Sequence, residues 1–191
     1  MKIETAGELL EEKTGSPAIC SPGGTPIHRA AEEIIEMARA YLSDGGSFLK
    51  SGDAVNALAS YAYGLGWMDA GIDMGIISSP GNEEFMTLSC DEEIPGSLHD
   101  HLEEKTGRYH RMLESAIGSV VPAPDRESPL FPAAGKITNK AKSHLKEGIG
   151  YEDNKKLSPA LWHFSYGYGW LDAGVRCGLL AITGDRTLFT V

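Results

Sequence analysis

Two aspartates are the residues of this chain whose type and position could do chemistry. Asp69 and Asp172 occupy the same place in two nearly identical segments, YGLGWMDAG at residues 63–71 and YGYGWLDAG at residues 166–174. Each lies in the middle of an apolar helical pattern, and a buried carboxylate must be paired or hydrogen-bonded, or it stays protonated. Two interpretations are open. The aspartates contact a ligand or transfer protons, or they are structural carboxylates that accept hydrogen bonds from a neighbouring helix end, Trp N–H or Tyr hydroxyl. The structural interpretation is favoured, because no second catalytic group stands at a fixed spacing.

Each segment also carries two aromatic residues at helical spacing. Such residues usually pack in a core, and the alternative is an aromatic cage around a ligand. If a ligand site exists, we expect it to be formed by six residues: Tyr63, Trp67, Asp69, Tyr166, Trp170 and Asp172.

Other motifs do not complete a chemical site. The Gly-x-Gly of each segment follows no strand and lacks the third glycine of a dinucleotide fingerprint. His99 and Glu103 share a helix face, as do His110 and Glu114, but no recognised metal-ligand set is completed. Arg108 and His110 do not have the spacing of toxin-like helical ribonucleases, and neither a P-loop nor a Gly-x-Ser-x-Gly motif occurs. We therefore predict no catalytic residue, no metal site and no cofactor, and a non-enzymatic protein is favoured.

Net charge limits the class of partner. The chain has 191 residues and a formal net charge of −10. This charge disfavours sequence-independent binding to nucleic acid, which needs Lys and Arg to neutralise phosphates, and binding to an anionic membrane surface. A neutral or cationic protein or small molecule is compatible with it.

Cysteine usage and hydropathy predict the compartment. Cys20, Cys90 and Cys177 lie far apart and form neither a disulfide framework nor a zinc-binding pattern. The first residues contain no apolar signal segment, and the longest apolar stretch, near residues 67–77, contains two aspartates and is too short to span a bilayer. We expect a cytoplasmic protein.

The chain is duplicated. From Ala54 and Leu157 onward, 12 of 35 aligned positions are identical without a gap. Two weaker matches lie upstream, Leu10–Gly15 with Leu102–Gly107 and Leu49–Gly52 with Leu145–Gly148. Their order is the same in both halves, which indicates duplication of a whole unit. We therefore predict two units, residues 1–90 and 91–191.

Each unit is predicted to contain three helices. In the first unit these are a short opening helix near residues 4–14, a helix that starts at Thr25-Pro26, and a helix capped by Asp53 that ends before Pro80. In the second unit they cover about residues 98–120, 133–147 and 158–182. The fold is therefore expected to be all-α, with the two units packed as one pseudo-symmetric body. The tails after Gly81 and Gly184 are either extended or form a short β-ribbon with each other.

Three glycines line one side of each final helix. They are Gly64, Gly71 and Gly75 in the first copy, and Gly167, Gly174 and Gly178 in the second. Each interior glycine costs about 1 kcal/mol relative to alanine, so a line of three indicates close approach of another helix. We interpret the line as a helix–helix contact, with the contact between the two copies as one candidate.

These motifs resemble a small archaeal family, the domain of unknown function family 357. The first half carries the resemblance at Tyr41–Asp44, Phe48–Asp53, Ala57–Leu58, Tyr61–Gly64 and Gly66–Gly71. The second half carries it at Tyr109, Leu113, Leu145–Gly148 and Tyr166–Gly178. The resemblance implies three-helix bundles, usually one per chain, and implies no activity.

The function predicted from the sequence is a non-enzymatic binding or scaffold protein. The alternative is a small-ligand-binding protein or enzyme that uses a cleft between the two repeats, lined by Asp69 and Asp172.

Overall fold

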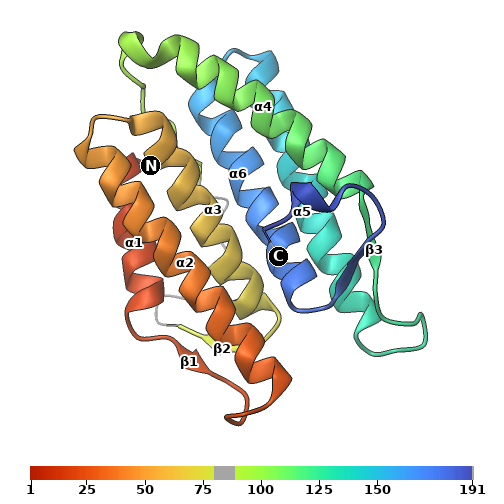
Figure 1. The fold of residues 1–191 in the computed structure, drawn as a ribbon. Coiled ribbons are helices and arrows are strands. Elements are labelled where there is room, and N and C mark those ends of the chain that lie inside the picture. The colour runs from red at the N-terminus through yellow and green to blue at the C-terminus, as the bar shows by residue number, and fades with distance from the viewer. Residues whose placement is uncertain (80–88, 191) are drawn as a thin grey trace.

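The computed structural model describes residues 1–79 and 89–190 as an all-α protein of two three-helix units (Figure 1). The first unit contains α1 (Ile3–Gly15), α2 (Pro26–Lys50) and α3 (Ala54–Asp73). The second contains α4 (His99–Gly118), α5 (Phe131–Asp153) and α6 (Leu157–Arg176), together with two 3₁₀ turns, Gly96–Leu98 and Arg186–Leu188. No described helix is long and apolar enough to cross a membrane.

Local sequence signals set where the first unit's longer helices begin. The Thr25 hydroxyl accepts a hydrogen bond from the His28 N–H at 3.1 Å, and Pro26 takes the first position of α2. The Asp53 carboxylate accepts from the Asn56 N–H at 3.0 Å and caps α3. Gly52 precedes this cap with a φ of +82°, in the left-handed region that favours glycine. Both predicted starts are confirmed.

The packing of α2 and α5 explains why glycines do not end these helices. Gly45 lies so close to the Tyr61 ring that an added Cβ would be 2.3 Å from a ring carbon. Gly148 lies against the Phe164 ring in the same way, again at 2.3 Å. The prediction that α5 ends near residue 147 was therefore wrong, because Gly148 is a packing position and the helix continues to Asp153. The pair also shows that Gly148 corresponds to Gly45, so its predicted match to Gly52 was wrong.

The opening helices follow this same register. Leu10 contacts Gly64, and Leu113 contacts Gly167 at the equivalent place in the second unit. The predicted match of Leu10 to Leu102 was therefore wrong. A short Leu-Glu-Glu-Lys-Thr-Gly run occurs in both helices, but the residues that pack against the final helix define the repeat.

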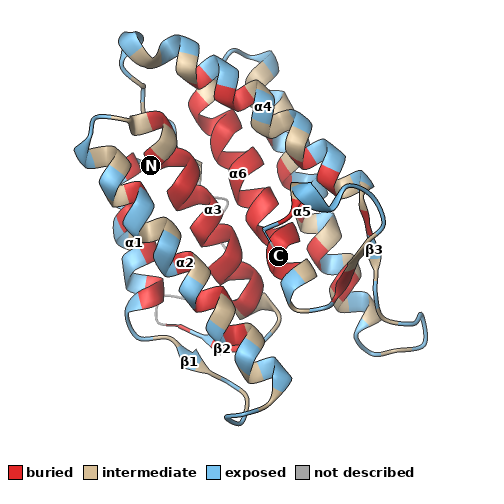
Figure 2. Cartoon of the chain, viewed as in Figure 1, coloured by how far each residue is buried: buried red, intermediate tan, exposed pale blue. Residues whose placement is uncertain are grey.

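Helices α3 and α6 lie side by side at the centre of the molecule (Figure 2). Nearly every residue of both is buried, from Val55 to Gly71 and from Ser158 to Gly174, with Asn56 the exception. The other helices flank this pair, α1 and α2 on α3, and α4 and α5 on α6 (Figure 1). Two helices that are apolar on almost every side bury that surface most fully against each other.

The two copies approach each other closely at Gly66 and Gly169. A Cβ at Gly66 would lie 2.3 Å from the Tyr166 carbonyl oxygen, and a Cβ at Gly169 would lie 2.4 Å from the Tyr63 carbonyl oxygen. The predicted glycine line has a different place, because Gly64 faces α1 and α2 of its own unit. Gly71 likewise faces Ile34 of α2, whereas Gly75 lies beyond the end of α3 with a φ of +70° and no atom near an added Cβ. The line is therefore a helix–helix contact only at its first two positions, and it is not the contact between the copies.

Two short antiparallel ribbons lie within the units. Strand β1 (Ala18–Ile19) pairs with β2 (Ile77–Ser78), and β3 (Val120–Pro122) pairs with β4 (Leu180–Ile182). Each ribbon joins the connection between the first two helices of a unit to the segment after its third helix. The alternative in which the two tails pair with each other falls partly outside the described residues, because residues 81–88 of the first tail are not among them. In the second tail, Arg186–Leu188 is a 3₁₀ turn.

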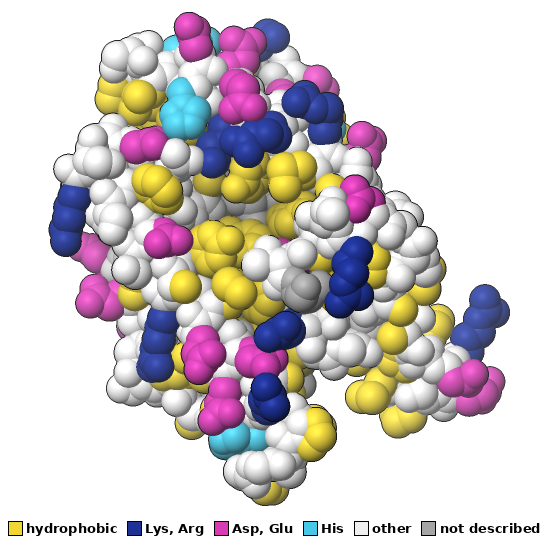
Figure 3. Space-filling view, in the orientation of Figure 1, with side chains coloured by type: hydrophobic (Ala, Val, Ile, Leu, Met, Phe, Trp, Pro, Cys, Tyr) yellow, Lys and Arg dark blue, Asp and Glu magenta, His cyan; other side chains and the backbone are white. Residues whose placement is uncertain are grey.

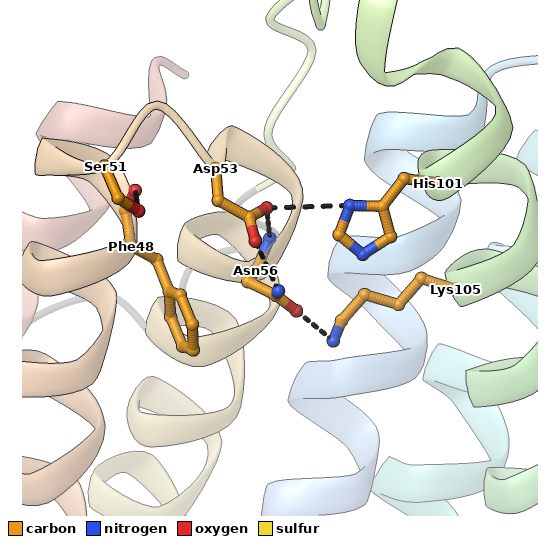
Figure 4. Close-up of polar contacts among 6 residues, drawn as sticks. All are labelled: Phe48, Ser51, Asp53, Asn56, His101 and Lys105. Carbon is orange, nitrogen blue, oxygen red and sulfur yellow. Dashed lines mark hydrogen bonds and ion pairs between the residues drawn. The ribbon is translucent and has the colours of Figure 1, made fainter.

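Polar contacts join the units near the start of α3 (Figure 4). The Lys105 ammonium on α4 donates to the Asn56 side-chain oxygen, and Asn56 in turn donates to Asp53 at 2.5 Å. His101 Nδ1 lies 3.7 Å from an Asp53 oxygen. The cap of α3 therefore also contacts the second unit.

Candidate functional site

Four of the six candidate residues, the two tyrosines and the two aspartates, form a reciprocal arrangement across the α3–α6 interface. The Tyr63 hydroxyl on α3 donates to Asp172 on α6, and the Tyr166 hydroxyl on α6 donates to Asp69 on α3 at 2.7 Å. Each tyrosine therefore serves the aspartate of the other copy. The structural interpretation of the aspartates anticipated a Tyr hydroxyl as donor, although the sequence could not show that the donor comes from the other copy.

The two aspartates differ in their remaining partner. Asp69 forms an ion pair with Lys13 of α1, with a distance of 2.9 Å between Lys Nζ and Asp Oδ1, and both side chains are more than nine-tenths buried. The register of the repeat places Ala116 at the position equivalent to Lys13. Asp172 is instead approached by the Thr190 N–H at 3.4 Å, and Tyr63 also contacts the Thr190 hydroxyl. Within the described part of the chain, Asp172 has no ion pair.

This difference changes the electrostatics of the second site. Burial raises the pKa of the Asp172 carboxyl to about 6, and the hydrogen bonds from Tyr63 and Thr190 offset part of the shift. Burial and the adjacent carboxylates also raise the pKa of Tyr63 and of Tyr166, so both hydroxyls stay protonated as donors. A carboxyl with a pKa of about 6 can both take up and release a proton near neutral pH. This is the property that a general acid–base group needs.

Trp67 and Trp170 lie in the core beside these pairs. Both indoles are fully buried, and each ring packs on the tyrosine one turn earlier, with centroids 6.3 Å apart for Tyr63–Trp67 and 6.4 Å for Tyr166–Trp170. This is the core packing anticipated for an aromatic stripe. Whether the six residues also bind a ligand stays a prediction.

A separate apolar cavity of about 350 Å³ lies between the two copies, at the end where α2 and α5 begin. Equivalent residues of the two units line it: Ile27 and Leu130, Ala30 and Ala133, Met74 and Cys177, and Ile76 and Leu179. Ile27 and Leu130 are more than half exposed. In Figure 3, hydrophobic side chains flank the notch at the lower end of the molecule, between the start of α2 and the loop before α5.

Sequence reasoning missed this cavity. Ile27 lies one turn before Ala31, the first buried residue of α2, and its side chain is exposed. The sequence does contain one indication of the cavity: Ile27 and Leu130 occupy equivalent positions of the two copies, and Leu130 lies in a proline-rich linker. A cleft between the repeats was anticipated, and the one described here is lined by other residues than Asp69 and Asp172.

Comparison with known families identifies the class of this protein. The model of the family described as protein of unknown function (DUF357) matches residues 7–77 and 108–180. The chain therefore belongs to this family and contains two copies of its unit. Searches of curated proteins and of solved structures find no significant match.

Proposed function

We propose that this protein is a non-enzymatic binding module that takes a hydrophobic anchor of a protein partner into the cavity between its two copies. The observation that carries the proposal is the cavity itself, with its two exposed flanking side chains, Ile27 and Leu130. Exposed apolar residues around a pocket are typical of protein-interaction sites, in which a few large side chains supply most of the binding energy.

The cavity has the size and chemistry for such an anchor. A volume of about 350 Å³ lies near the lower end of the range for ligand pockets and accommodates one or two large apolar side chains. Among its lining residues the charged one is Arg176, whose Nε donates to Glu33 at 2.7 Å. The net charge of −10 favours a partner whose anchor is flanked by neutral or basic residues.

Affinity capture from the host with a surface variant tests this proposal. Replacing Ile27 and Leu130 together by Glu places charges in the cavity mouth and is expected to abolish capture of a partner that the wild-type chain retains. Val121→Glu is the matched control, because Val121 is also an exposed apolar residue, at 45%, but does not line the cavity. Equal capture by all three proteins, or no reproducible partner, contradicts the proposal. A small apolar molecule that copurifies in native mass spectra would instead identify the cavity as a small-ligand site.

The alternative function is a small-ligand-binding protein or enzyme that uses Asp69 and Asp172. The raised pKa of Asp172 favours it, because perturbed carboxyls cluster at functional sites. Asp172→Asn separates the two functions. Loss of metabolite turnover or binding in a variant at least as stable as the wild type supports this alternative, whereas a change in stability with turnover and binding retained supports a structural carboxylate.

We further propose that the protein works in the cytoplasm of an archaeal host. All three cysteines are free, which fits a reducing compartment. Fractionation of host cells with a tagged chain tests the location, and recovery from the membrane or the medium contradicts it.

A further inference from the structure

Two buried histidines and a glutamate converge between α5 and α6 of the second unit. His144 Nδ1 lies 2.9 Å from His163 Nδ1, and His163 Nδ1 lies 3.4 Å from Glu147 Oε2. The ligand atoms of the three side chains all lie within 4.8 Å of one another. We propose that His144, Glu147 and His163 form a binding site for a divalent first-row transition metal ion of the zinc class.

The separations suit an ion after a small adjustment. A tetrahedral ion with metal–nitrogen bonds of about 2.0–2.1 Å holds two ligand nitrogens about 3.3 Å apart. The two imidazole nitrogens therefore need to separate by about 0.4 Å. Without an ion, one neutral imidazole donates its Nδ1 proton to the Nδ1 of the other. Binding of an ion to both Nδ1 atoms requires the donating imidazole to carry that proton on Nε2 instead, so that both histidines bind as neutral ligands.

Neighbouring groups orient the three ligands. The Ser143 hydroxyl donates to Glu147 Oε1 at 3.1 Å, which leaves Oε2 directed to His163. The Tyr151 ring stacks on His163 with centroids 5.3 Å apart, and Tyr166 packs on His144 at 4.6 Å. Such surrounding contacts hold metal ligands in a productive orientation.

Burial and access also fit a metal site. His144 and His163 are 5% and 2% exposed, whereas the Glu147 side chain is 42% exposed, so an ion and water can reach the site from the glutamate side. Lys140 is the nearby cation that opposes ion binding, and the Glu147 carboxylate compensates for it. Three protein ligands leave a tetrahedral ion one position for water.

The site is a property of the second unit. The corresponding positions of the first unit carry Tyr41, Asp44 and Ser60. The sequence predicted no metal site, because the histidine–glutamate pairs within one helix complete no ligand set. His163 comes from a different helix, so the cluster becomes visible only after α5 and α6 pack together.

Calorimetric titration of the metal-free protein with ZnCl₂ tests the site. We expect saturable binding of one ion per chain and a higher melting temperature with the ion. Glu147→Gln is expected to weaken the affinity at least about tenfold without changing the melting temperature of the metal-free protein. Binding of Co²⁺ should give the visible absorption of a tetrahedral site, which this variant and His163→Gln should lose.

Glu152→Gln is the matched control. Glu152 also lies on α5 and pairs with a histidine, His110, at 2.7 Å, but it belongs to no three-ligand cluster of the described residues. Its variant should bind Zn²⁺ like the wild type. Absence of saturable Zn²⁺ and Co²⁺ binding, or equal affinities for wild type and Glu147→Gln, overturns the proposal and identifies His144–His163 as a hydrogen-bonded core pair. Because Glu147 is half exposed, this variant remains informative even if a histidine variant does not fold.

Discussion

At the scale of single residues, the two equivalent aspartates of the duplicated unit have different surroundings. Asp69 and Asp172 hold the same place on equivalent helices and accept the same kind of hydrogen bond from a tyrosine of the other copy. Asp69 has the ammonium of Lys13 as counter-ion, whereas Asp172 has uncharged donors. The two carboxylates should therefore contribute to stability with opposite sign at neutral pH.

Asp69→Asn is expected to destabilise the fold by about 3–5 kcal/mol, because it leaves the buried Lys13 ammonium without its counter-ion. Urea unfolding followed by circular dichroism measures this loss. Lys13→Met combined with Asp69→Asn is the control, since it removes both charges and should recover much of the loss. A single Asn variant as stable as the wild type would show that the ion pair is not formed.

Asp172→Asn should give a pH-dependent difference in stability. The pKa of Asp172 is raised in the folded state, from 3.8 to about 6, so the folded chain binds more protons between these values than the unfolded chain. The stability that this residue contributes therefore falls as pH rises through that interval. Relative to the Asn variant, the wild type should lose about 2–3 kcal/mol between about pH 4 and pH 7.

Urea midpoints of both proteins across this range measure the effect. The difference between the two proteins is the relevant quantity, because the pH dependence that other ionisable groups contribute is the same in both. A difference that does not change with pH would contradict the raised pKa.

At the scale of elements, the crossing of α3 and α6 depends on direct backbone contact. An alanine at Gly66 would place its Cβ 2.3 Å from the Tyr166 carbonyl oxygen, and backbone in a packed helix cannot move aside without separating the two helices. Gly66→Ala is expected to cost about 3 kcal/mol or more, measured by thermal or urea unfolding.

Gly150→Ala is the control for this substitution. Gly150 lies on an exposed part of α5 with no atom near the position of an added Cβ. The higher helix propensity of alanine should stabilise the protein by up to about 1 kcal/mol. If both variants are stabilised alike, the close crossing of α3 and α6 is wrong.

At the scale of the whole molecule, the two units share one core. Neither α3 nor α6 is covered by its own unit alone, since each buries its remaining face against the other. We therefore expect a single cooperative unfolding transition. In hydrogen exchange with mass spectrometry at increasing urea, peptides from α3 and α6 should lose protection together. Separate midpoints would show two independently stable domains.

Much of this fold could be predicted from the sequence. Proline and Asp caps identified the starts of α2 and α3, and the identical motifs identified the duplication and the two buried helices. The upstream register could not be predicted, because it depends on contacts such as Gly45 with Tyr61, which pair a small residue on one helix with a ring on another. The misleading match between residues 10–15 and 102–107 includes buried residues of both helices, such as Leu10 and Leu102, so a short identical run does not show which residues pack against the final helix.

The sequence by itself determined that the chain is helical and duplicated, and that each copy carries an aspartate in an apolar helix. Only the tertiary structure decided what surrounds each aspartate, which glycines allow the two copies to approach each other, and which residues line the cavity between them. The physical reason is that helix formation depends on neighbours within a few positions along the chain. Pairs such as Tyr63 with Asp172, or His144 with His163, exist only once different helices have packed.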